Sequence, residues 1–531
     1  MRRRSFIRST IILMISGLLV RILGFVYRIY LSNLIGAEGM GLFQLISPVF
    51  SLIILTLSSG ISIAVSRLVA AENVRGNVIN TRRITNCALW LIVSLGTIVS
   101  IVLLFNVRYI SNVILKDPRT YYSILLYIPC IPVIASASAL KGYFYGLQEV
   151  APTALSQIVE QIIRIGIVIT MATQFIGKGL EYACAAATIG MTLGEVSNLL
   201  VLCIIYRRKN RKRVSQQGLK RRKVLLKEIL AISVPVSFNR FTTSFMYTIE
   251  TILIPRSLLK GGLNYQTSMI EFGKLTGMAM PLLYFPTIVT SSLATVLVPA
   301  ISEAIAAKNY KILNYKISRS IQITVLLGFI FTAVFYSFPD IIGNVLYKNE
   351  SIGDMLKILS YTCIFMYLQQ TLIGTLNGLG KQALSLRHAI VGYIVRIGFV
   401  VFCMPYYGVN GYVWGTIASS VIVCILNLAA VTKTTGMIIN LKNWVIKPLA
   451  VCMGMILCSP IIIEFLSVFQ FKALITAALC VILQLGAALA LIVVLDILSI
   501  SEIIKFTGLN KIIKTPSNIS KAVNHLDHLL M

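Results

Sequence analysis

Charged side chains are scarce in this chain, and acidic ones are the scarcest. Asp, Glu, Lys and Arg together make up 12% of the 531 residues, whereas 57% of the residues are hydrophobic. A soluble protein of this length needs far more polar surface in contact with water, so the composition excludes that class. We interpret the chain as a protein that crosses a membrane many times.

Sequence motifs of enzymes and ATP-driven pumps are also lacking. No glycine-rich Walker A loop occurs, which excludes an ATPase within this chain, and no Asp-rich cluster suggests a metal-dependent glycosyltransferase. The ten cysteines are scattered singly, nearly all in apolar runs, and no pair has metal-site spacing. We therefore expect no metal, no cofactor, no disulfide framework and no enzymatic activity.

Long apolar runs fill most of the sequence. Because about 20 apolar residues cross a bilayer as a helix, the runs predict an all-α polytopic fold with about fourteen transmembrane helices. The predicted spans are residues 9–31, 42–66, 84–106, 120–144, 152–176, 181–206, 228–255, 276–300, 317–338, 356–379, 384–405, 411–432, 443–466 and 471–498.

Basic residues outnumber acidic ones by 48 to 18 and are concentrated in alternate loops. In a soluble protein this excess would suggest nucleic acid, but here the positive-inside rule explains most of it. With the N-terminus in the cytoplasm, 33 basic residues lie in inner segments and 10 in outer loops. This asymmetry predicts that both termini are cytoplasmic.

The densest basic segment, residues 207–227, holds eleven lysines and arginines between the sixth and seventh predicted spans. We interpret it as a cytoplasmic linker that lies against anionic membrane lipids. A regulatory or partner-binding role for the same segment is the alternative. Nucleic acid is not an expected partner.

Three pairs of matching segments, at nearly one offset, indicate an internal duplication. Residues 142–148 match 374–380, residues 163–166 match 395–398, and residues 64–73 match 300–309. Each unit has six predicted spans, so both enter the membrane in the same orientation, and such parallel repeats bind substrate between the halves. The predicted divisions are an N-terminal lobe at 1–206, the linker at 207–227, a C-terminal lobe at 228–433, two further helices at 434–498 and a cytoplasmic tail at 499–531.

Charged residues inside the predicted spans are candidates for function because they are costly in lipid and usually face a polar cavity. Arg21 and Arg28 are seven residues apart, so they lie two helical turns apart on nearly one face. Five intramembrane arginines against three glutamates leave about two positive charges uncompensated. Since the planar guanidinium suits bidentate binding of phosphate, we expect an anionic substrate with a phosphate or pyrophosphate head group. The predicted cationic, substrate-binding cavity consists of Arg21, Arg28, Arg240 and Arg396. The candidate charge partners are Glu160, Arg164, Glu195 and Glu250.

Several of these charges have a purely structural alternative. Glu160 and Arg164 are four residues apart on one helix and would neutralise each other. In the second repeat, Gly392 occupies the position equivalent to Glu160, so Arg396 has no carboxylate four residues before it. Any carboxylate partner of Arg396 would lie on another helix. Arg28 would alternatively extend to the outer membrane interface.

Residues 21–25 (RILGF), Tyr27-Arg28, residues 34–44 (LIGAEGMGLFQ) and Pro48 resemble the opening of a known family. The family is the multidrug/oligosaccharidyl-lipid/polysaccharide (MOP) exporter superfamily, and within it the branch of stage V sporulation protein B and lipid II flippase-like proteins. The resemblance extends over the whole chain. It implies a bacterial cell-membrane protein whose lobes alternate in access around a cationic cavity.

By the same resemblance, the substrate is an undecaprenyl-pyrophosphate-linked sugar that moves from the inner to the outer leaflet. The last two helices would form a groove for its lipid tail. Arg21 stands at the first-helix cavity arginine of the family. The next family arginine falls at Tyr27, one place before Arg28, and a third falls near Leu57 or Ser58, where nothing is basic.

The favoured hypothesis is therefore a flippase for a lipid-linked cell-wall precursor, in particular lipid II for the peptidoglycan of the spore cortex. A flippase for another polysaccharide unit and an ion-coupled multidrug exporter are alternatives; the exporter would require one of the glutamates. A scaffold that recruits cell-wall synthases through the basic linker is a third.

Overall fold

The computed structural model describes residues 2–209, 221–348, 350–469 and 471–497, and every regular element in these ranges is helical. The predicted all-α class is confirmed. The principal helices are α1 (Arg2–Val74), α2 (Val78–Tyr109), α3 (Tyr121–Tyr127), α4 (Cys130–Gly146), α5 (Ala151–Ile167), α6 (Thr173–Phe175), α7 (Leu180–Lys209), α8 (Arg222–Lys260), α9 (Tyr265–Gly273), α10 (Met280–Tyr284), α11 (Thr287–Ala306), α12 (Tyr310–Ser337), α13 (Pro339–Leu346), α14 (Gly353–Leu359), α15 (Thr362–Gly378), α16 (Gln382–Phe402), α17 (Met404–Tyr407), α18 (Val409–Thr435), α19 (Lys447–Ser467) and α20 (Ala473–Val494).

Ten helices in the described ranges are long and apolar enough to cross a membrane, or eleven if the bent pair of segments 118–127 and 130–146 is one span. The exact number of fourteen is not confirmed. The three predicted spans that the count of eleven leaves out lie in the second arm of α1, in α8 and in α15. α8 contains Arg240 and Glu250, which lower its mean hydropathy, and α15 has only 17 residues.

α1 contains a sharp break at Gly36, where φ is 69° and ψ is −178°. A positive φ is strained for residues with a Cβ but not for glycine, so this position permits the chain to reverse. The break divides α1 into a first arm, which carries Arg21 and Arg28, and a second arm that begins at Ala37. The predicted spans 9–31 and 42–66 are these two arms.

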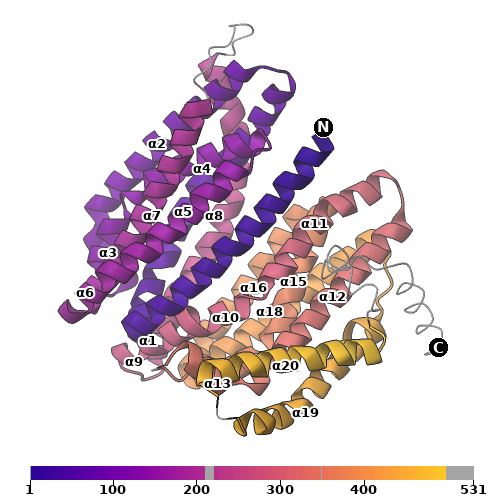
Figure 1. Ribbon diagram of the computed structural model, residues 1–531. Coiled ribbons are helices and arrows are strands. Elements are labelled where there is room, and N and C mark those ends of the chain that lie inside the picture. Colours follow the sequence, from indigo (N-terminus) through magenta and orange to yellow (C-terminus); the bar gives the residue numbers. More distant parts are fainter. Residues whose placement is uncertain (1, 210–220, 349, 470, 498–531) are drawn as a thin grey trace.

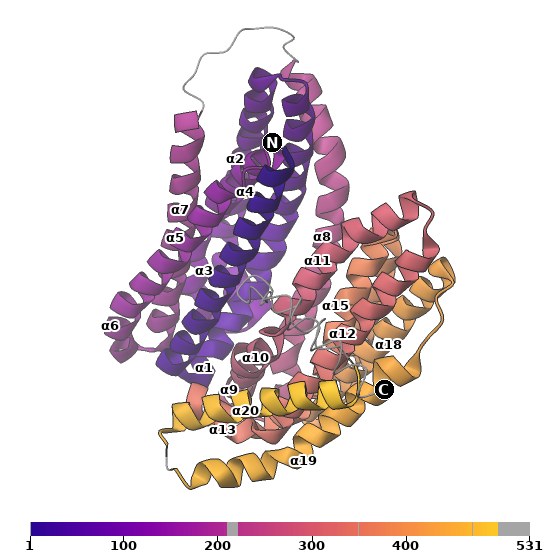
Figure 2. The ribbon, with the colours of Figure 1, turned by 45° about the vertical axis from the view of Figure 1, so that its right-hand side comes forward.

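The helices form two bundles, which Figures 1 and 2 show from two sides. α1 to α7 make the N-terminal bundle and α9 to α18 the C-terminal bundle. The bundles meet at the end that holds α9 and α13, and they diverge toward the end that holds the N-terminus. α19 and α20 pack on the C-terminal bundle through α12 and α13. We call the two ends of the molecule the closed end and the open end.

α8 contacts both bundles. Near the open end, Leu225 and Ile229 are buried in a core cluster of the N-terminal bundle, while the other half of α8 packs on α16. The sequence assigns α8 to the C-terminal lobe from residue 228. In the structure, its first half lies with the N-terminal lobe. Of the predicted linker, residues 207–209 end α7 and residues 222–227 begin α8, while 210–220 and the predicted tail lie outside the described residues.

The duplication in the sequence corresponds to equivalent helix packing. A Cβ on Gly142 or Gly146 of α4 would lie 2.6 or 2.7 Å from the carbonyl oxygens of Ser62 and Ser66. At the same offset of 232 residues, a Cβ on Gly374 or Gly378 of α15 would lie 2.7 or 3.0 Å from side-chain atoms of α11. Pairs of small residues four apart allow membrane helices to approach closely. The same close crossing of two helices therefore occurs once in each bundle.

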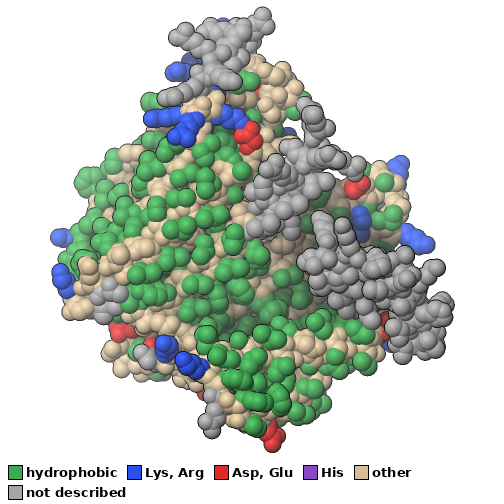
Figure 3. Space-filling model, viewed as in Figure 1, with side chains coloured by type: hydrophobic (Ala, Val, Ile, Leu, Met, Phe, Trp, Pro, Cys, Tyr) green, Lys and Arg blue, Asp and Glu red, His purple; other side chains and the backbone are tan. Residues whose placement is uncertain are grey.

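Hydrophobic side chains cover most of the molecular face in Figure 3, and Lys and Arg gather toward the ends. An exposed apolar surface of this extent is stable in lipid rather than in water. The arrangement is that of a multi-pass membrane protein.

Candidate functional site

Arg21 and Arg28 of the first arm of α1 line one cavity between the two bundles. Its volume is about 390 Å³, and its other walls are formed by α10, α11 and α15 of the C-terminal bundle. Tyr284, Ser291 and Gln370 contribute polar groups to these walls. The seven-residue spacing thus places both guanidinium groups toward the opposite bundle, where a substrate between the halves would lie.

Arg21 is the more exposed of the two and makes a contact across the bundles. Its Nη1 donates a hydrogen bond to Ser291 Oγ of α11 at 2.9 Å. Next to it, the rings of Phe25 and Phe285 pack with centroids 4.6 Å apart. A single neutral hydroxyl leaves most of the five guanidinium N–H groups available to an incoming anion.

Arg28 lies deeper and is only partly exposed. The ionisable groups that interact with it electrostatically are the phenols of Tyr27, Tyr247 and Tyr347. In the described ranges, neither Arg28 nor Arg21 forms an ion pair with a carboxylate. Both cations of this cavity are therefore uncompensated.

Arg396, in contrast, has a carboxylate partner on α8. Its Nε lies 3.3 Å from Glu250 Oε1, and Glu250 is 1% exposed. The Tyr412 hydroxyl donates to the same carboxylate oxygen at 3.2 Å, and the guanidinium lies 5.1 Å from the centroid of the Tyr393 ring. Arg396 does not line the cavity of Arg21, but Tyr284, which does, interacts with it electrostatically.

Arg164, the repeat equivalent of Arg396, has two carboxylate partners. Its Nη2 lies 2.5 Å from Glu160 Oε1 and 3.7 Å from Glu195 Oε1. The Asn198 amide donates to Glu160 Oε2 at 2.8 Å. The Glu160–Arg164 pair has the spacing of four residues noted in the sequence, and Glu195 joins it from α7. With all three groups ionised, the cluster has a formal net charge of −1.

Arg240 lies apart from the cavity that Arg21 and Arg28 share. It is exposed on α8, and within the described part of the chain it has no ion-pair partner. The structure thus brings together two of the four arginines predicted for a cationic cavity. A third pairs with Glu250 and does not line this cavity, and the fourth is elsewhere on α8.

Sequence reasoning missed the polar groups that face Arg21 from the C-terminal bundle. Ser291 lies in the segment TIVTSSLAT of α11, which contains five hydroxyl side chains among apolar residues. Hydroxyls in a membrane helix are common, because they also donate to the helix's own carbonyls, as Ser291 does to Ile288. Because of this local role, a hydroxyl that lines a cavity cannot be recognised from the sequence alone.

The closed end is held by hydrogen bonds between the turn of α1 and the C-terminal bundle. Asn33 Nδ2 donates to the Leu346 carbonyl at 2.6 Å, and the Ala37 N–H donates to Glu350 Oε1 at 2.9 Å. Backbones also touch, since a Cβ on Gly273 would lie 1.8 Å from the Ala37 carbonyl oxygen. Access between the bundles is therefore blocked at this end.

A further cross-bundle bond of the closed end involves Tyr265 of α9, whose hydroxyl donates to Asp117 Oδ2 at 2.6 Å. Burial, together with the hydrogen bond to Asp117 and the negative charge of that carboxylate, raises the pKa of Tyr265 above its ordinary value. Asp117 also pairs with Arg119, which reaches Glu38 at 2.7 Å. These contacts join residues 117–119 to the second arm of α1 and to the start of α9 at the closed end.

Comparison with known proteins places this architecture in a family. The family model described as polysaccharide biosynthesis protein matches residues 6–305, which is more than half of the chain. The chain belongs to the polysaccharide biosynthesis protein family. A second model, MatE, matches residues 276–402.

This family member has relatives in Bacillus subtilis. It is 31% identical to stage V sporulation protein B over 84% of this chain and 87% of that protein. It is 25% identical to lipid II flippase MurJ over 74% of this chain and 76% of the relative. The expected membership of the MOP exporter superfamily is thereby confirmed.

The fold is also that of solved structures of the superfamily. A structure of lipid II flippase MurJ in an inward closed conformation aligns with a TM-score of 0.69, at 14% identity, over 92% of this chain and 98% of that one. At that identity the likeness concerns the fold alone. It supports the two-lobe arrangement of Figures 1 and 2.

Proposed function

We propose that this protein is a flippase that moves an undecaprenyl-pyrophosphate-linked cell-wall precursor from the inner to the outer leaflet of a bacterial cell membrane. The observation that carries the proposal is the pair of uncompensated arginines, Arg21 and Arg28, in a cavity between two lobes of a polysaccharide biosynthesis family fold. Lipid II for spore cortex peptidoglycan is the proposed substrate. The similarity to stage V sporulation protein B and to lipid II flippase MurJ supports that choice.

In this proposal the pyrophosphate binds between Arg21 and Arg28. Arginine forks form bidentate, charge-assisted hydrogen bonds with phosphate oxygens, and two cations suit the two negative charges of a diester pyrophosphate. Ser291 and Gln370 on the opposite wall would orient the sugar hydroxyls. The polyprenyl chain would stay in lipid, along a groove formed by α19 and α20.

The proposed orientation puts the open end in the cytoplasm, because the N-terminus and the described basic residues of 207–209 and 221–227 lie there. The structure then corresponds to a state that accepts substrate from the inner leaflet. Release to the outer leaflet requires the closed end to separate, at Asn33, Ala37 and Glu350 among others. Alternating access would arise as the bundles rock about the bound head group.

Arg21→Ala and Arg28→Ala test the proposal. The assay measures labelled lipid II that becomes accessible at the far leaflet of proteoliposomes containing purified protein. Each charge-assisted hydrogen bond to phosphate contributes about 1.5–3 kcal/mol, so we expect each variant to lose at least about tenfold in transport rate. Arg387→Ala removes an exposed arginine of the C-terminal bundle and should leave the rate unchanged.

Full transport by both alanine variants would reject a cationic binding site in this cavity. Arg240→Ala adds a separate measurement. A loss of transport there, without loss of lipid II binding in the state described here, would assign Arg240 to a later position on the transport path. The sequence-based prediction places Arg240 in the substrate-binding cavity itself, so it predicts that Arg240→Ala weakens lipid II binding as well as transport.

An ion-coupled multidrug exporter is the second candidate, and the match of the MatE model to residues 276–402 favours it. It predicts that Glu250 or a glutamate of the Arg164 cluster is essential while Arg21 is not. Drug efflux that survives Arg21→Ala and fails in Glu195→Gln would support the exporter over the flippase.

A further inference from the structure

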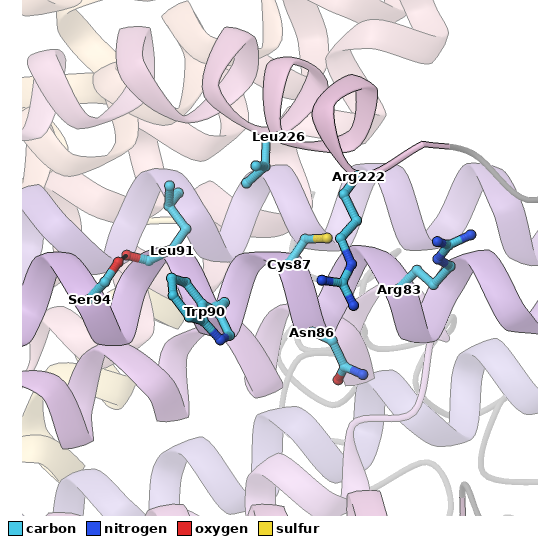
Figure 4. A pocket seen from close by; sticks show the side chains of 8 residues that line it. All are labelled: Arg83, Asn86, Cys87, Trp90, Leu91, Ser94, Arg222 and Leu226. Atoms are coloured by element: carbon cyan, nitrogen blue, oxygen red, sulfur yellow. Dashed lines mark hydrogen bonds between the residues drawn. The ribbon is translucent and has the colours of Figure 1, made fainter.

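A second cavity lies between α2 and α8 at the open end, on walls that the Arg21 cavity does not share. Its volume is about 540 Å³ (Figure 4). Arg83, Asn86 and Trp90 line it from α2, and Arg222 lines it from the first turn of α8. The proposed transport path has no use for this site.

The polar half of the cavity consists of hydrogen-bond donors. Arg222 reaches from α8 toward Cys87 and Asn86, and Arg83 lies one turn away on α2 (Figure 4). Both arginines line the same cavity, on either side of Cys87 and Asn86. Neither arginine has an ion-pair partner among the residues that the structure describes.

Asn86 adds neutral donors to the two cations. The Tyr206 hydroxyl donates to Asn86 Oδ1 at 3.1 Å, which occupies the amide oxygen and directs the amide N–H groups away from α7. Two guanidinium groups and an amide, with no carboxylate among the lining residues, recognise an anion with several oxygens. A phosphate ester has that chemistry.

The other half of the cavity is apolar and continues along α2. Trp90 is 80% exposed, and Val93, Ile101 and Phe105 follow it on the outer surface, with Phe105 86% exposed. Arginine next to tryptophan is typical of the depth at which lipid head groups meet the hydrocarbon. A ligand here would have a charged head at Arg83 and Arg222 and an apolar tail beside α2.

We propose that the cavity between α2 and α8 binds an anionic phospholipid, with its phosphate between Arg83 and Arg222 and an acyl chain beside Trp90. Basic pockets between membrane helices at the cytoplasmic side are suited to such head groups. A bound lipid would join the start of α8 to α2, and so fix the helix that leads out of the basic linker. The inference does not depend on what the central cavity carries.

Trp90 provides a probe at the site itself. The chain has three tryptophans, so Trp414→Phe with Trp444→Phe leaves Trp90 alone. The purified full-length protein is placed in bilayers that contain increasing fractions of phosphatidylglycerol or phosphatidylcholine with brominated acyl chains. Bromine quenches tryptophan fluorescence on contact, so the quenching curve reports which lipid occupies the cavity.

We expect brominated phosphatidylglycerol to reach half-maximal quenching of Trp90 at a lower fraction than brominated phosphatidylcholine. The preference should amount to about fivefold for each arginine engaged. Arg83→Gln with Arg222→Gln should abolish the preference and leave quenching by phosphatidylcholine unchanged, which also shows that the fold is intact. The matched control, Lys311→Gln with Arg387→Gln, removes the same charge from the C-terminal bundle and should retain the preference.

Three outcomes would overturn the proposal. Equal quenching by both lipids in the unmodified site would indicate ordinary boundary lipid. Relief of quenching by soluble glycerol phosphate would indicate a site for free phosphate esters, and relief by undecaprenyl phosphate would assign the cavity to the transport substrate.

Trp444 is buried and donates to Ser318, so its replacement by Phe carries a risk to folding. Native mass spectrometry of the protein with all three tryptophans therefore provides a second test. It should detect phosphatidylglycerol bound in preference to phosphatidylcholine, and one fewer tightly bound phosphatidylglycerol in the Arg83→Gln, Arg222→Gln variant than in the Lys311→Gln, Arg387→Gln control. Equal lipid counts in the two variants would refute the site.

Discussion

Glu250→Gln should be one of the most destabilising single substitutions in the membrane domain. At 3.3 Å from Arg396 Nε, and with an effective dielectric constant of about 20, the carboxylate attracts the guanidinium by about 5 kcal/mol. Glutamine keeps the shape and can still accept the Tyr412 hydroxyl, but it leaves Arg396, whose side chain is 20% exposed, without its carboxylate. Removing one partner of a buried pair costs about 3–5 kcal/mol in unfolding free energy.

The N-terminal bundle offers a matched comparison in Glu160→Gln. Arg164 retains Glu195 at 3.7 Å, and the substitution relieves the repulsion between the two carboxylates. The remaining attraction is about 4.5 kcal/mol by the same arithmetic. We therefore expect a loss of only about 1 kcal/mol, the net value of one hydrogen bond.

Unfolding of the purified variants in detergent micelles, followed by circular dichroism, measures the unfolding free energy that Glu250→Gln and Glu160→Gln each lose. The double variant Glu250→Gln, Arg396→Gln replaces the ion pair by two amides. It should recover at least half of the unfolding free energy that Glu250→Gln loses. If Glu250→Gln and Glu160→Gln cost the same, or if the double variant is as unstable as Glu250→Gln, the ion-pair reasoning is refuted.

Two further substitutions test the closed end. Gly273→Ala places a methyl group 1.8 Å from the Ala37 carbonyl, so hydrogen exchange at this end should accelerate, whereas Gly398→Ala, with no atom within 4 Å, should have no effect. Tyr265→Phe should cost about 1 kcal/mol by loss of its bond to Asp117. Because the folded-state pKa of Tyr265 is raised, this stability is fully present below the ordinary phenol pKa of about 10 and is lost as pH rises through the higher folded-state pKa. If the difference in unfolding free energy between the wild type and Tyr265→Phe already shrinks between pH 7 and 9, this assignment is wrong.

Sequence periodicity predicted those features of the site that lie within one helix. The shared face of Arg21 and Arg28 and the proximity of Glu160 to Arg164 follow from helix geometry alone. The partner of Arg396 did not follow, because its distance to Glu250 depends on how α8 packs against α16. From the sequence, Glu195 and Glu250 were equally acceptable partners.

The features that sequence reasoning did not foresee arise where helices deviate from one span each. Residues 222–227 read as part of a charged linker, yet they form the first turns of α8, which crosses from one bundle to the other. Ser291 faces Arg21 only because α11 and the first arm of α1, 270 residues apart in sequence, meet at the cavity. Long-range packing of this kind leaves no local pattern in the residues.

The break at Gly36 makes the first arm of α1 a lever. Arg21 lies fifteen residues from Gly36, which is about 22 Å along a helix, while Asn33 and Ala37 lie beside the fulcrum at the closed end. A tilt of about 10° at this point would move Arg21 by about 4 Å, farther than its 2.9 Å bond to Ser291. A rotation at this turn would thus change the distance between Arg21 and the opposite wall of the cavity, and Gly36, which has no side chain, adopts the positive φ that the turn requires.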